Sequence, residues 1–503
     1  MPRKRVLIFI VAYNAEHTIS NVLARLPEAA FNHAGYSCDV LIIDDCSPDA
    51  TFREGHSAIS SYSGRSVTIL RNPHNQGYGG NQKLGYRYAI DQNYDVVVLL
   101  HGDGQYAPES IPELIAPVVA GECDALFGSR MANKRSAREG GMPFYKLMGN
   151  ILLTKTENFL LGAALTEWHS GYRVYSCAAL DKIPFQLNSN DFDFDTEIII
   201  QLLLINSRIR ELPIKTFYGD EVCHVNGLRY ARLIIWDCIL SRLQQLGILY
   251  DPKFDVRSDE AAYLPKFSFH SSHSLALEAV NSSDMLLLIS SGTYTLTAPI
   301  ITKAKRVCIV DHFVDEKTRN GCHAWYEGEI EELDLDETFP DIEFSKVLVL
   351  DTIEHLDAPE TLLNNLRHSR CAGNAEILIT TPNVAFFLQR IMLLIGQFNY
   401  GKRGILDFTH RRLFTRSSLQ RTLQQQGFEI CDWSGIPAPF PLALPSYPKI
   451  SALLLKINGL LLRLFPGLFS YQLIVRAKPF PSVGKLLQDT WKHTEEQLNT
   501  GSS

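Results

Sequence analysis

The sequence predicts an α/β protein made of two doubly wound domains, and three observations support this. Apolar runs typical of buried strands alternate with longer helical patterns along the first half of the chain. After a polar stretch at residues 250–274 the same alternation begins again. The length of 503 residues exceeds what one hydrophobic core normally holds. Strand, helix, strand repetition favours a mostly parallel sheet with helices on both faces in each domain.

Each expected strand is a short run of β-branched and other apolar residues. In the first half these runs are 6–11, 40–43, 67–70, 96–100 and 125–127, separated by helical patterns such as 19–26 and 82–91. In the second half they are 285–289, 307–310, 347–350 and 377–379. We therefore expect a first domain at residues 1–245, a linker at 246–275, a second domain at 276–480 and a polar, fraying tail at 481–503.

Composition limits the classes of function. The formal net charge of -7 gives no general electrostatic basis for nucleic-acid binding, so we expect none. Ten cysteines are scattered without a Cys-x-x-Cys pair or zinc-site spacing, which is typical of reduced structural thiols in a cytosolic protein. The apolar start passes into polar residues without a cleavage site, so we interpret residues 6–11 as a strand and not as part of a signal peptide.

The apolar segment at residues 451–475 is interrupted before it reaches the length of a membrane span. The residues that interrupt it are Lys456, Asn458, Arg463 and Pro466. The pattern predicts an amphipathic helix followed by a strand. Two interpretations stay open, namely packing in a core or domain interface and contact with a membrane surface. We expect a cytoplasmic location, with peripheral contact at the inner face of the membrane as the alternative.

Polar residues follow three of the expected strands in the first half. They are Tyr13, Asn14 and Glu16 after the first strand, Asp44 and Asp45 after the second, and His101, Asp103 and Gln105 after the fourth. In an open parallel sheet, ligands gather at the carboxyl ends of the strands. These side chains are therefore candidates for one binding site, although Asp and Ser at strand ends also serve as caps of turns and helices.

The residue types fit the needs of a nucleoside diphosphate. Asp103 and Gln105 are two positions apart, so in an extended segment both point the same way and offer oxygen atoms to Mg²⁺ or Mn²⁺. A hard cation held in this way can bridge two phosphates. Asp45 is placed to meet the base or the ribose, and Tyr13 to line the same pocket. Residues 219–227 are expected to form either a loop over this site or a plain surface loop.

Further motifs make a family resemblance specific. They are Tyr13-Asn14-x-Glu16, Asp44-Asp45-x-Ser47-Pro48-Asp49, Asn75-x-Gly77-x-Gly79, Gly102-Asp103-Gly104-Gln105, Gly128-Ser129-Arg130, Glu167-Trp168-His169-Ser170-Gly171-Tyr172-Arg173 and Glu211-Leu212-Pro213-Ile214. In this order they resemble the family 2 inverting glycosyltransferases of GT-A fold, and within them the dolichyl- and polyprenyl-phosphate sugar synthases. The resemblance implies metal-dependent transfer of a sugar from a UDP- or GDP-sugar to a polyprenyl phosphate or a growing surface glycan.

The metal motif departs from the pattern of that family at one position. His101 stands where the Asp-x-Asp motif has its first aspartate. Imidazole suits Mg²⁺ less well than carboxylate does, so Asp103 and Gln105 carry the metal assignment and His101 is a third candidate.

The resemblance also implies candidates for the acceptor side. Arg130 and Arg173 would hold a lipid-phosphate acceptor, because guanidinium pairs bidentately with phosphate. A phosphate acceptor is already anionic and needs no general base. A hydroxyl acceptor needs one, and Glu167, where the family has an aspartate, is the candidate. Each arginine could instead form a structural salt bridge.

The second half resembles the class I S-adenosylmethionine-dependent methyltransferases through less specific motifs. They are the segments 307–311, 328–331, 347–356, 381–383 and 407–415. The resemblance implies cofactor contacts from Gly292, Asp311, Glu329 and Asp351, and a supporting place in the pocket wall for His355 and His410. Residues 288–294 hold one glycine where that family has three, which would crowd the cofactor. A working methyltransferase and a degenerate scaffold domain therefore both stay open.

Three functions follow for the whole chain. The leading one is a metal-dependent glycosyltransferase with an appended methyltransferase-like domain. The second is methyl transfer to a glycan as the main activity, with S-adenosylmethionine as cofactor. The third is a non-enzymatic scaffold of two domains. The sequence leaves the donor base, the sugar and the oligomeric state open.

Overall fold

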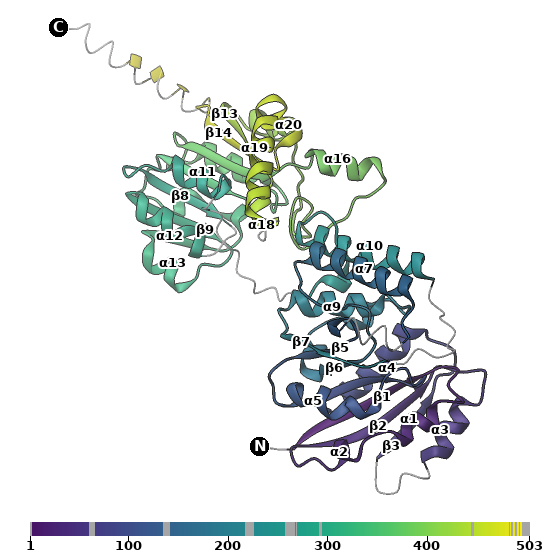
Figure 1. The fold of residues 1–503 in the computed structure, drawn as a ribbon. Helices are drawn as coiled ribbons and strands as arrows, with labels where there is room; N and C mark the ends of the chain where they lie inside the picture. Colours follow the sequence, from purple (N-terminus) through teal and green to yellow (C-terminus); the bar gives the residue numbers. More distant parts are fainter. Residues whose placement is uncertain are drawn as a thin grey trace, which may run out of the picture. The chain divides into compact units, whose positions relative to one another are not determined.

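In a computed structural model, the chain forms two compact α/β units. The structure describes residues 3–59, 66–133, 141–216, 226–256, 267, 269–290, 294–443, 447–481 and scattered positions from 483 to 494. The first unit comprises Met1–Gln244 with Asp251–Ser258, and the second comprises Gln245–Tyr250 with Asp259–Ser503. Each unit contains a seven-stranded sheet of its own (Figure 1).

The sheet of the first unit has the strand order β3-β2-β1-β4-β6-β5-β7. Its strands are β1 (Lys4–Ala12), β2 (Tyr36–Asp44), β3 (Val67–Arg71), β4 (Val96–His101), β5 (Ala125–Ser129), β6 (Arg173–Ser176) and β7 (Ile209–Pro213). Neighbours are parallel except that β6 runs antiparallel to β4 and β5. Because β1 pairs in parallel with both β2 and β4, the carboxyl ends of these three strands lie at one edge.

Helices cover both faces of this sheet, since its central strands are apolar on both sides. In β1, Ile8 and Ile10 enter one core cluster while Leu7 and Phe9 enter the other. The helices are α1 (Ile19–Ala24), α2 (Glu28–Phe31), α3 (Thr51–Ile59), α4 (Tyr78–Asp91), α5 (Ile111–Val119), α7 (Phe144–Leu161), α8 (Cys177–Leu180), α9 (Phe194–Leu204) and α10 (Gly227–Gln245).

The sheet of the second unit has the order β10-β9-β8-β11-β12-β14-β13. Its strands are β8 (Met285–Ser290), β9 (Arg306–Asp311), β10 (Ala324–Glu327), β11 (Lys346–Leu350), β12 (Glu376–Pro382), β13 (Phe428–Ile436) and β14 (Gln472–Pro479). The strands from β10 to β12 are parallel, and β14 runs antiparallel to β12 and β13. The strand order therefore reverses between β8 and β11, which is where doubly wound sheets bind ligands.

Two helices of the second unit begin at capping boxes. Ser271 and Ser274 form a capping box at the start of α11, and Thr415 and Ser418 form one at the start of α17. The helices are α11 (Ser272–Ala279), α12 (Tyr294–Lys303), α13 (Glu316–Gly321), α14 (Leu335–Thr338), α15 (Pro359–His368), α16 (Phe387–Leu394), α17 (Arg416–Gln425), α18 (Phe440–Ala443), α19 (Pro448–Leu464) and α20 (Pro466–Phe469). Apolar clusters again lie on both faces of the sheet.

Every strand expected from an apolar run lies within an observed strand, and residues 451–475 contain most of α19 and the start of β14. The apolar runs did not reveal β6, β7, β10 and β13. These strands carry polar or charged residues, as in the sequence RVYS of β6, so they lack a continuous apolar run.

The expected linker at 246–275 contains ordered structure. Residues 251–258 belong to the first unit, where the Lys253 ammonium lies 2.9 Å from Asp237 and is also hydrogen-bonded to Glu197. Helix α11 begins at Ser272, inside the expected linker. Among the described residues, no helix combines the length and apolar character needed to cross a bilayer.

Candidate functional site

Main-chain hydrogen bonds join the three strand ends that the sequence singled out. The amide of Asp45 donates to the carbonyl of Ala12 at 2.9 Å, and the amide of Gly102 donates to the carbonyl of Val11 at 2.9 Å. The hydroxyl of Thr18 donates to the Gly102 carbonyl at 2.7 Å. The segments after β1, β2 and β4 are therefore held at one edge of the sheet.

Asp103 lies in the turn that follows β4. One carboxylate oxygen accepts a hydrogen bond from the Gln105 amide at 3.0 Å, and the other lies 3.9 Å from Nδ1 of His101. Burial alone would raise the pKa of Asp103, but the nearby His101 and the hydrogen bond from the Gln105 amide outweigh it, so the pKa lies below its usual value. The side chain remains 41% exposed. Asp103 therefore presents an ionised carboxylate that a cation can reach.

His101 is held between aromatic side chains. Its ring packs edge-on against Tyr78 and Tyr106, and its Nε2 lies 3.4 Å from the Tyr78 hydroxyl. A Cβ atom at Gly171 would come within 2.5 Å of the His101 Nε2 atom, so only glycine leaves room for the imidazole. The Tyr106 hydroxyl accepts a hydrogen bond from the Gly171 amide at 2.8 Å. The structure thus brings His101, Asp103 and Gln105 together.

Asp44 and Asp45 are both buried and both already hold parts of the chain. Asp44 accepts hydrogen bonds from the amide and hydroxyl of Ser47 and lies 3.3 Å from the Arg71 guanidinium. Asp45 accepts hydrogen bonds from the side chain of Asn72 at 2.7 Å, and from the amides of Gln76 and Gly77 at 2.8 and 3.0 Å. Asp45 therefore fixes the loop that leads into α4.

The three residues after β1 have different surroundings. Tyr13 is 47% exposed and can approach a ligand from solvent. Asn14 adopts a left-handed conformation with φ of 52°, and its amide donates to the Ser47 hydroxyl at 3.0 Å. The Glu16 carboxylate accepts a hydrogen bond from the Ala50 amide at 2.8 Å. Glu16 and Asn14 therefore join the end of β1 to the loop after β2.

Arg130 and Glu167 form a buried ion pair. The Glu167 carboxylate accepts hydrogen bonds from the amide and guanidinium of Arg130, the amide of Met131 at 3.3 Å and the side chain of Asn150 at 2.8 Å. Burial would raise the pKa of Glu167, but the charge and hydrogen bonds of Arg130 and the Asn150 hydrogen bond outweigh it and lower the pKa. A saturated carboxylate of lowered pKa is a poor proton acceptor.

Arg173 is buried and its donors are directed at the protein itself. Its guanidinium donates to the carbonyls of Ser170, Asp195 and Trp168 at 2.7, 3.0 and 2.7 Å, and lies 3.5 Å from the Asp195 carboxylate. Burial would lower the pKa of Arg173, but the charge of Asp195 outweighs burial, so the pKa of Arg173 is raised. The arrangement is the structural salt bridge that the sequence left open, and it offers no donor to a phosphate.

Tyr78 and Asp195 belong to this site, and the sequence did not single them out. The Tyr78 hydroxyl donates to the Asp195 carboxylate at 3.0 Å, and Gln82 donates to its other oxygen at 3.2 Å. Tyr78 also stacks on Phe192, with the ring centroids 5.1 Å apart. Every second residue from 191 to 197 is acidic, and this pattern could have pointed to Asp195 as a site residue. Acidic residues are also common at the start of a helix, so the pattern is not specific.

In the second unit, the expected cofactor residues lie at or after strand ends. Asp311 ends β9 and is buried, whereas the Glu329 side chain is 67% exposed and lies 3.7 Å from His312. Asp351 follows β11 with φ of 46°, and its carboxylate accepts hydrogen bonds from Thr380, Gln472 and Ser272 at 2.6, 3.0 and 3.2 Å. Gly292 and most of the expected loop at 219–227 lie outside the described residues.

Comparison with known proteins supports the glycosyltransferase resemblance of the first half of the chain. The family described as "Glycosyl transferase family 2" matches residues 7–184. The chain is 28% identical to the UDP-N-acetylglucosamine–dolichyl-phosphate N-acetylglucosaminyltransferase of Methanococcus voltae, over 44% of this chain and 88% of that protein. It is 29% identical to the undecaprenyl-phosphate mannosyltransferase of Micrococcus luteus, over 48% of this chain and 99% of that protein. It is 28% identical to the polyprenol monophosphomannose synthase of Mycolicibacterium smegmatis, over 44% of this chain and 80% of that protein.

A solved structure of glucosyl-3-phosphoglycerate synthase from Mycobacterium tuberculosis, in complex with Mn²⁺, UDP-glucose and phosphoglyceric acid, is 17% identical and covers 47% of this chain and 79% of its own, with a TM-score of 0.35. The family match and the curated relatives remove the non-enzymatic scaffold as an account of the whole chain. Residues 7–184, which lie in the first α/β unit, form a glycosyltransferase family 2 domain, and the protein is an enzyme of the transferase type.

Proposed function

We propose that the first unit transfers a sugar from a UDP- or GDP-sugar to a polyprenyl phosphate, or to a surface glycan, with the help of Mg²⁺ or Mn²⁺. The accessible carboxylate of Asp103, held at the joined ends of β1, β2 and β4, carries this proposal. The names of the curated relatives support polyprenyl-phosphate acceptors.

The residues after β4 fit a divalent cation that is shared with a diphosphate. Asp103 offers a carboxylate, His101 an imidazole and Gln105 a side-chain amide. Such a cation needs one or two protein carboxylates when phosphates complete its shell. The imidazole favours Mn²⁺ over Mg²⁺. When bound, the cation would neutralise charge on the departing nucleoside diphosphate.

The donor contacts follow from the same edge. Tyr13 lies exposed beside it and would pack against the base, while Asp45 and Asn14 hold the surrounding loops in place. Asp44 and Glu16 act in the same way through Ser47 and Ala50. These four residues are positioning residues in the proposed site.

The acceptor side favours an anionic nucleophile. Glu167 is saturated by Arg130 and Asn150, so we assign it the task of positioning Arg130 and not that of a general base. A phosphate oxygen attacks the anomeric carbon without losing a proton, so the reaction needs no such base. Arg173 fixes Asp195 and the turn at Trp168 and Ser170.

Peripheral contact with a membrane would bring the protein to a lipid acceptor, and α19 supports it. A row of its apolar side chains at heptad spacing is exposed, comprising Ile450, Leu453, Ile457, Leu460 and Leu464. Lys449, Lys456 and Arg463 are exposed beside that row, and α19 contains no acidic residue. Apolar side chains flanked by basic ones are typical of helices that lie on anionic membranes.

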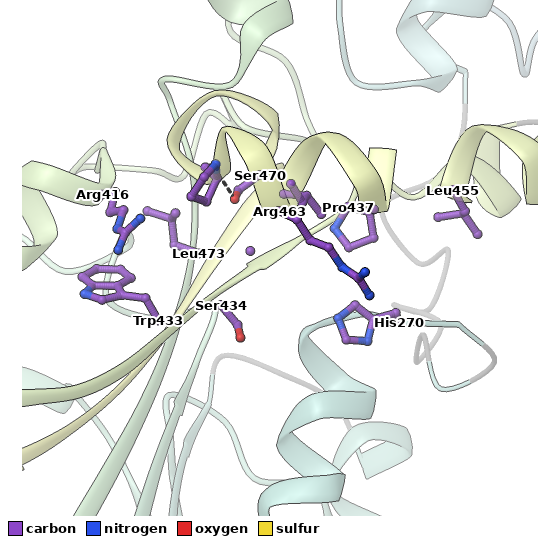
Figure 2. Close-up of a pocket in the computed structure, with 13 residues that line it drawn as sticks. His270, Arg416, Trp433, Ser434, Pro437, Leu455, Arg463, Ser470 and Leu473 are labelled. Atoms are coloured by element: carbon purple, nitrogen blue, oxygen red, sulfur yellow. Dashed lines mark hydrogen bonds between the residues drawn. The ribbon is translucent and has the colours of Figure 1, made fainter. Parts of the chain in front are cut away.

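Helix α19 also lines a cavity of about 670 Å³ in the second unit (Figure 2). Leu455, Leu462 and Arg463 line it from the helix, and Arg416 and Trp433 line it from α17 and β13. Arg416 lies over the Trp433 ring at 5.4 Å. Neither arginine has a carboxylate partner among the described residues. The cavity therefore suits an anionic group and supports contact with anionic lipid headgroups.

Transfer assays on the full chain test the leading function. The purified protein is incubated with UDP- and GDP-sugars, Mn²⁺ and undecaprenyl phosphate in detergent, and the lipid-linked product is measured. The wild type and Asp91→Asn, which alters an exposed ion pair with Arg87, should form product equally. Asp103→Ala and wild type with excess chelator should form none. Full activity in Asp103→Ala would refute the metal assignment.

The second unit stays a candidate for S-adenosylmethionine binding. Its strand order reverses between β8 and β11, and Asp311 and Asp351 lie at the strand ends beside this point, which supports a methyltransferase-like fold. Asp311, which ends β9, is the candidate for the ribose hydroxyls. Calorimetry of the full chain with S-adenosylmethionine tests this, and absence of heat at millimolar cofactor would leave the unit without that role.

A further inference from the structure

Three potential metal ligands converge in the second unit. Glu354 and His355 lie in the turn after β11, and His410 lies in the segment between α16 and α17. One carboxylate oxygen and one nitrogen from each imidazole lie within 4.8 Å of one another. The fold therefore brings together two histidines and a glutamate from separate segments at the carboxyl edge of the sheet.

The two imidazoles are oriented by the main chain. Nδ1 of His355 lies 3.2 Å from the carbonyl oxygen of Thr409, and Nδ1 of His410 lies 3.0 Å from that of Ile405. A carbonyl oxygen only accepts, so in each hydrogen bond Nδ1 carries the proton and Nε2 keeps its lone pair. Proteins commonly fix metal-binding histidines by this hydrogen bond.

No described side chain forms an ion pair with Glu354. It is 2% exposed, and neither carboxylate oxygen accepts a hydrogen bond from any described residue. Asp351 and Asp407 add negative charge around it. The arginines after His410 do not compensate, because Arg411 and Arg412 pair with Asp357 and Glu360. A buried carboxylate without a partner is costly, and a bound cation would remove that cost.

The main chain holds the two segments together without help from a ligand. The carbonyl of Glu354 accepts hydrogen bonds from the amides of Arg411 and Arg412, at 2.8 and 2.9 Å. The rings of His355 and His410 pack edge-on with centroids 4.9 Å apart. The three ligands are therefore already placed before any ion binds.

We propose that Glu354, His355 and His410 form a binding site for one divalent transition-metal ion of the Zn²⁺ class, distinct from the cation of the donor site. A carboxylate oxygen and two imidazole nitrogens suit Zn²⁺ or Co²⁺ better than Mg²⁺. Three protein ligands leave a coordination position for water or for an oxygen atom of a bound molecule. The site does not depend on the proposed glycosyl transfer.

Another cluster of carboxylates in the chain has its negative charge balanced by a lysine. Asp193, Glu197 and Asp237 also have closely spaced carboxylate oxygens. There the Lys253 ammonium is hydrogen-bonded to Glu197 and to Asp237. A lysine already supplies the positive charge in that cluster, whereas no described cation does so at Glu354.

Metal binding to the full chain tests the proposal. In the Asp103→Ala background, which removes the donor-site carboxylate, the metal-free protein is titrated with Co²⁺ and its visible absorption is recorded. One equivalent should bind with the spectrum of nitrogen ligation. Adding His355→Ala and His410→Ala should abolish that spectrum, and Zn²⁺ should then no longer raise the melting temperature.

Matched variants separate ligation from folding. His323→Ala with His368→Ala, which removes two exposed histidines of the same unit, should keep the Co²⁺ spectrum and the stoichiometry. Glu354→Gln keeps the shape of the side chain and should weaken Zn²⁺ binding at least tenfold, even if the histidine variants unfold. An unchanged spectrum in the folded His355/His410 variant, or unchanged Zn²⁺ affinity in Glu354→Gln, would overturn the assignment.

Discussion

Replacing Glu167 with glutamine should destabilise the first unit strongly. The carboxylate is buried and faces donors from Arg130, Met131 and Asn150. A glutamine keeps one acceptor oxygen but turns an NH₂ group toward those donors and removes the negative charge that faces the partly buried Arg130 guanidinium. Breaking a buried ion pair on one side costs about 3–5 kcal/mol, and we expect the free energy of unfolding to fall by about that amount.

Fluorescence of Trp168, which is fully buried next to Glu167, reports unfolding of this unit in denaturant. As a control, Glu122→Gln breaks an exposed pair with Arg210 and should cost less than about 1 kcal/mol. If Glu167 were instead a general base, Glu167→Gln would keep its stability and lose turnover about 10²–10⁴-fold. A loss of stability below about 1 kcal/mol would refute the positioning role.

The lowered pKa of Glu167 also predicts how its contribution to the free energy of unfolding changes with pH. A carboxyl whose folded pKa lies below its unfolded value stabilises the fold above the unfolded value of about 4.3, and this contribution is lost as the pH falls through the folded pKa. The stability difference between wild type and Glu167→Gln should therefore shrink in acid. A constant difference down to about pH 2 would contradict the linkage.

Three further outcomes are expected. Asp237 has its pKa raised to about 7, mainly by burial, so its contribution to stability is lost as the pH rises from about 4 through 7. Wild type should lose more stability over that range in denaturant titrations than Asp237→Asn. Gly171→Ala should displace His101 and cost about 1–3 kcal/mol of stability, measured by thermal unfolding. Leu453→Ser with Leu460→Ser should abolish cosedimentation with anionic vesicles, whereas Phe313→Ser with Trp325→Ser, also exposed in the second unit, should not.

The sequence was most informative where a residue's role depends on its neighbours in the chain. The strand that ends at His101 is a continuous apolar run, so the turn holding Asp103 could be placed before the fold was known. The partners of Asp45 and Glu167 depend on distant segments. Whether such a carboxylate faces a ligand or holds a loop is decided by groups 17 to 37 positions away, and no local pattern encodes this.

The antiparallel strand β6 is a second case in which the local sequence pattern did not predict the structure. Its Arg173 matches a family motif and suggested phosphate binding, yet the residue lies buried between β4 and β5 and pairs with Asp195 from α9. A charged residue in a short strand gives no apolar signal, so neither the strand nor the pair could be predicted. The cluster of Glu354, His355 and His410 escaped for a similar reason, since its members come from two segments that only the fold brings together.

Lys253 has a consequence for how this chain can be divided. It follows α10 in the sequence, yet its ammonium neutralises Glu197 and Asp237 inside the first unit. A fragment that ends at residue 245 would leave both carboxylates buried without a cation, whereas one that ends at residue 258 keeps the lysine. Residues 251–256 therefore go with the first unit, and an engineered exchange of the second unit should retain them so that Glu197 and Asp237 keep their cation.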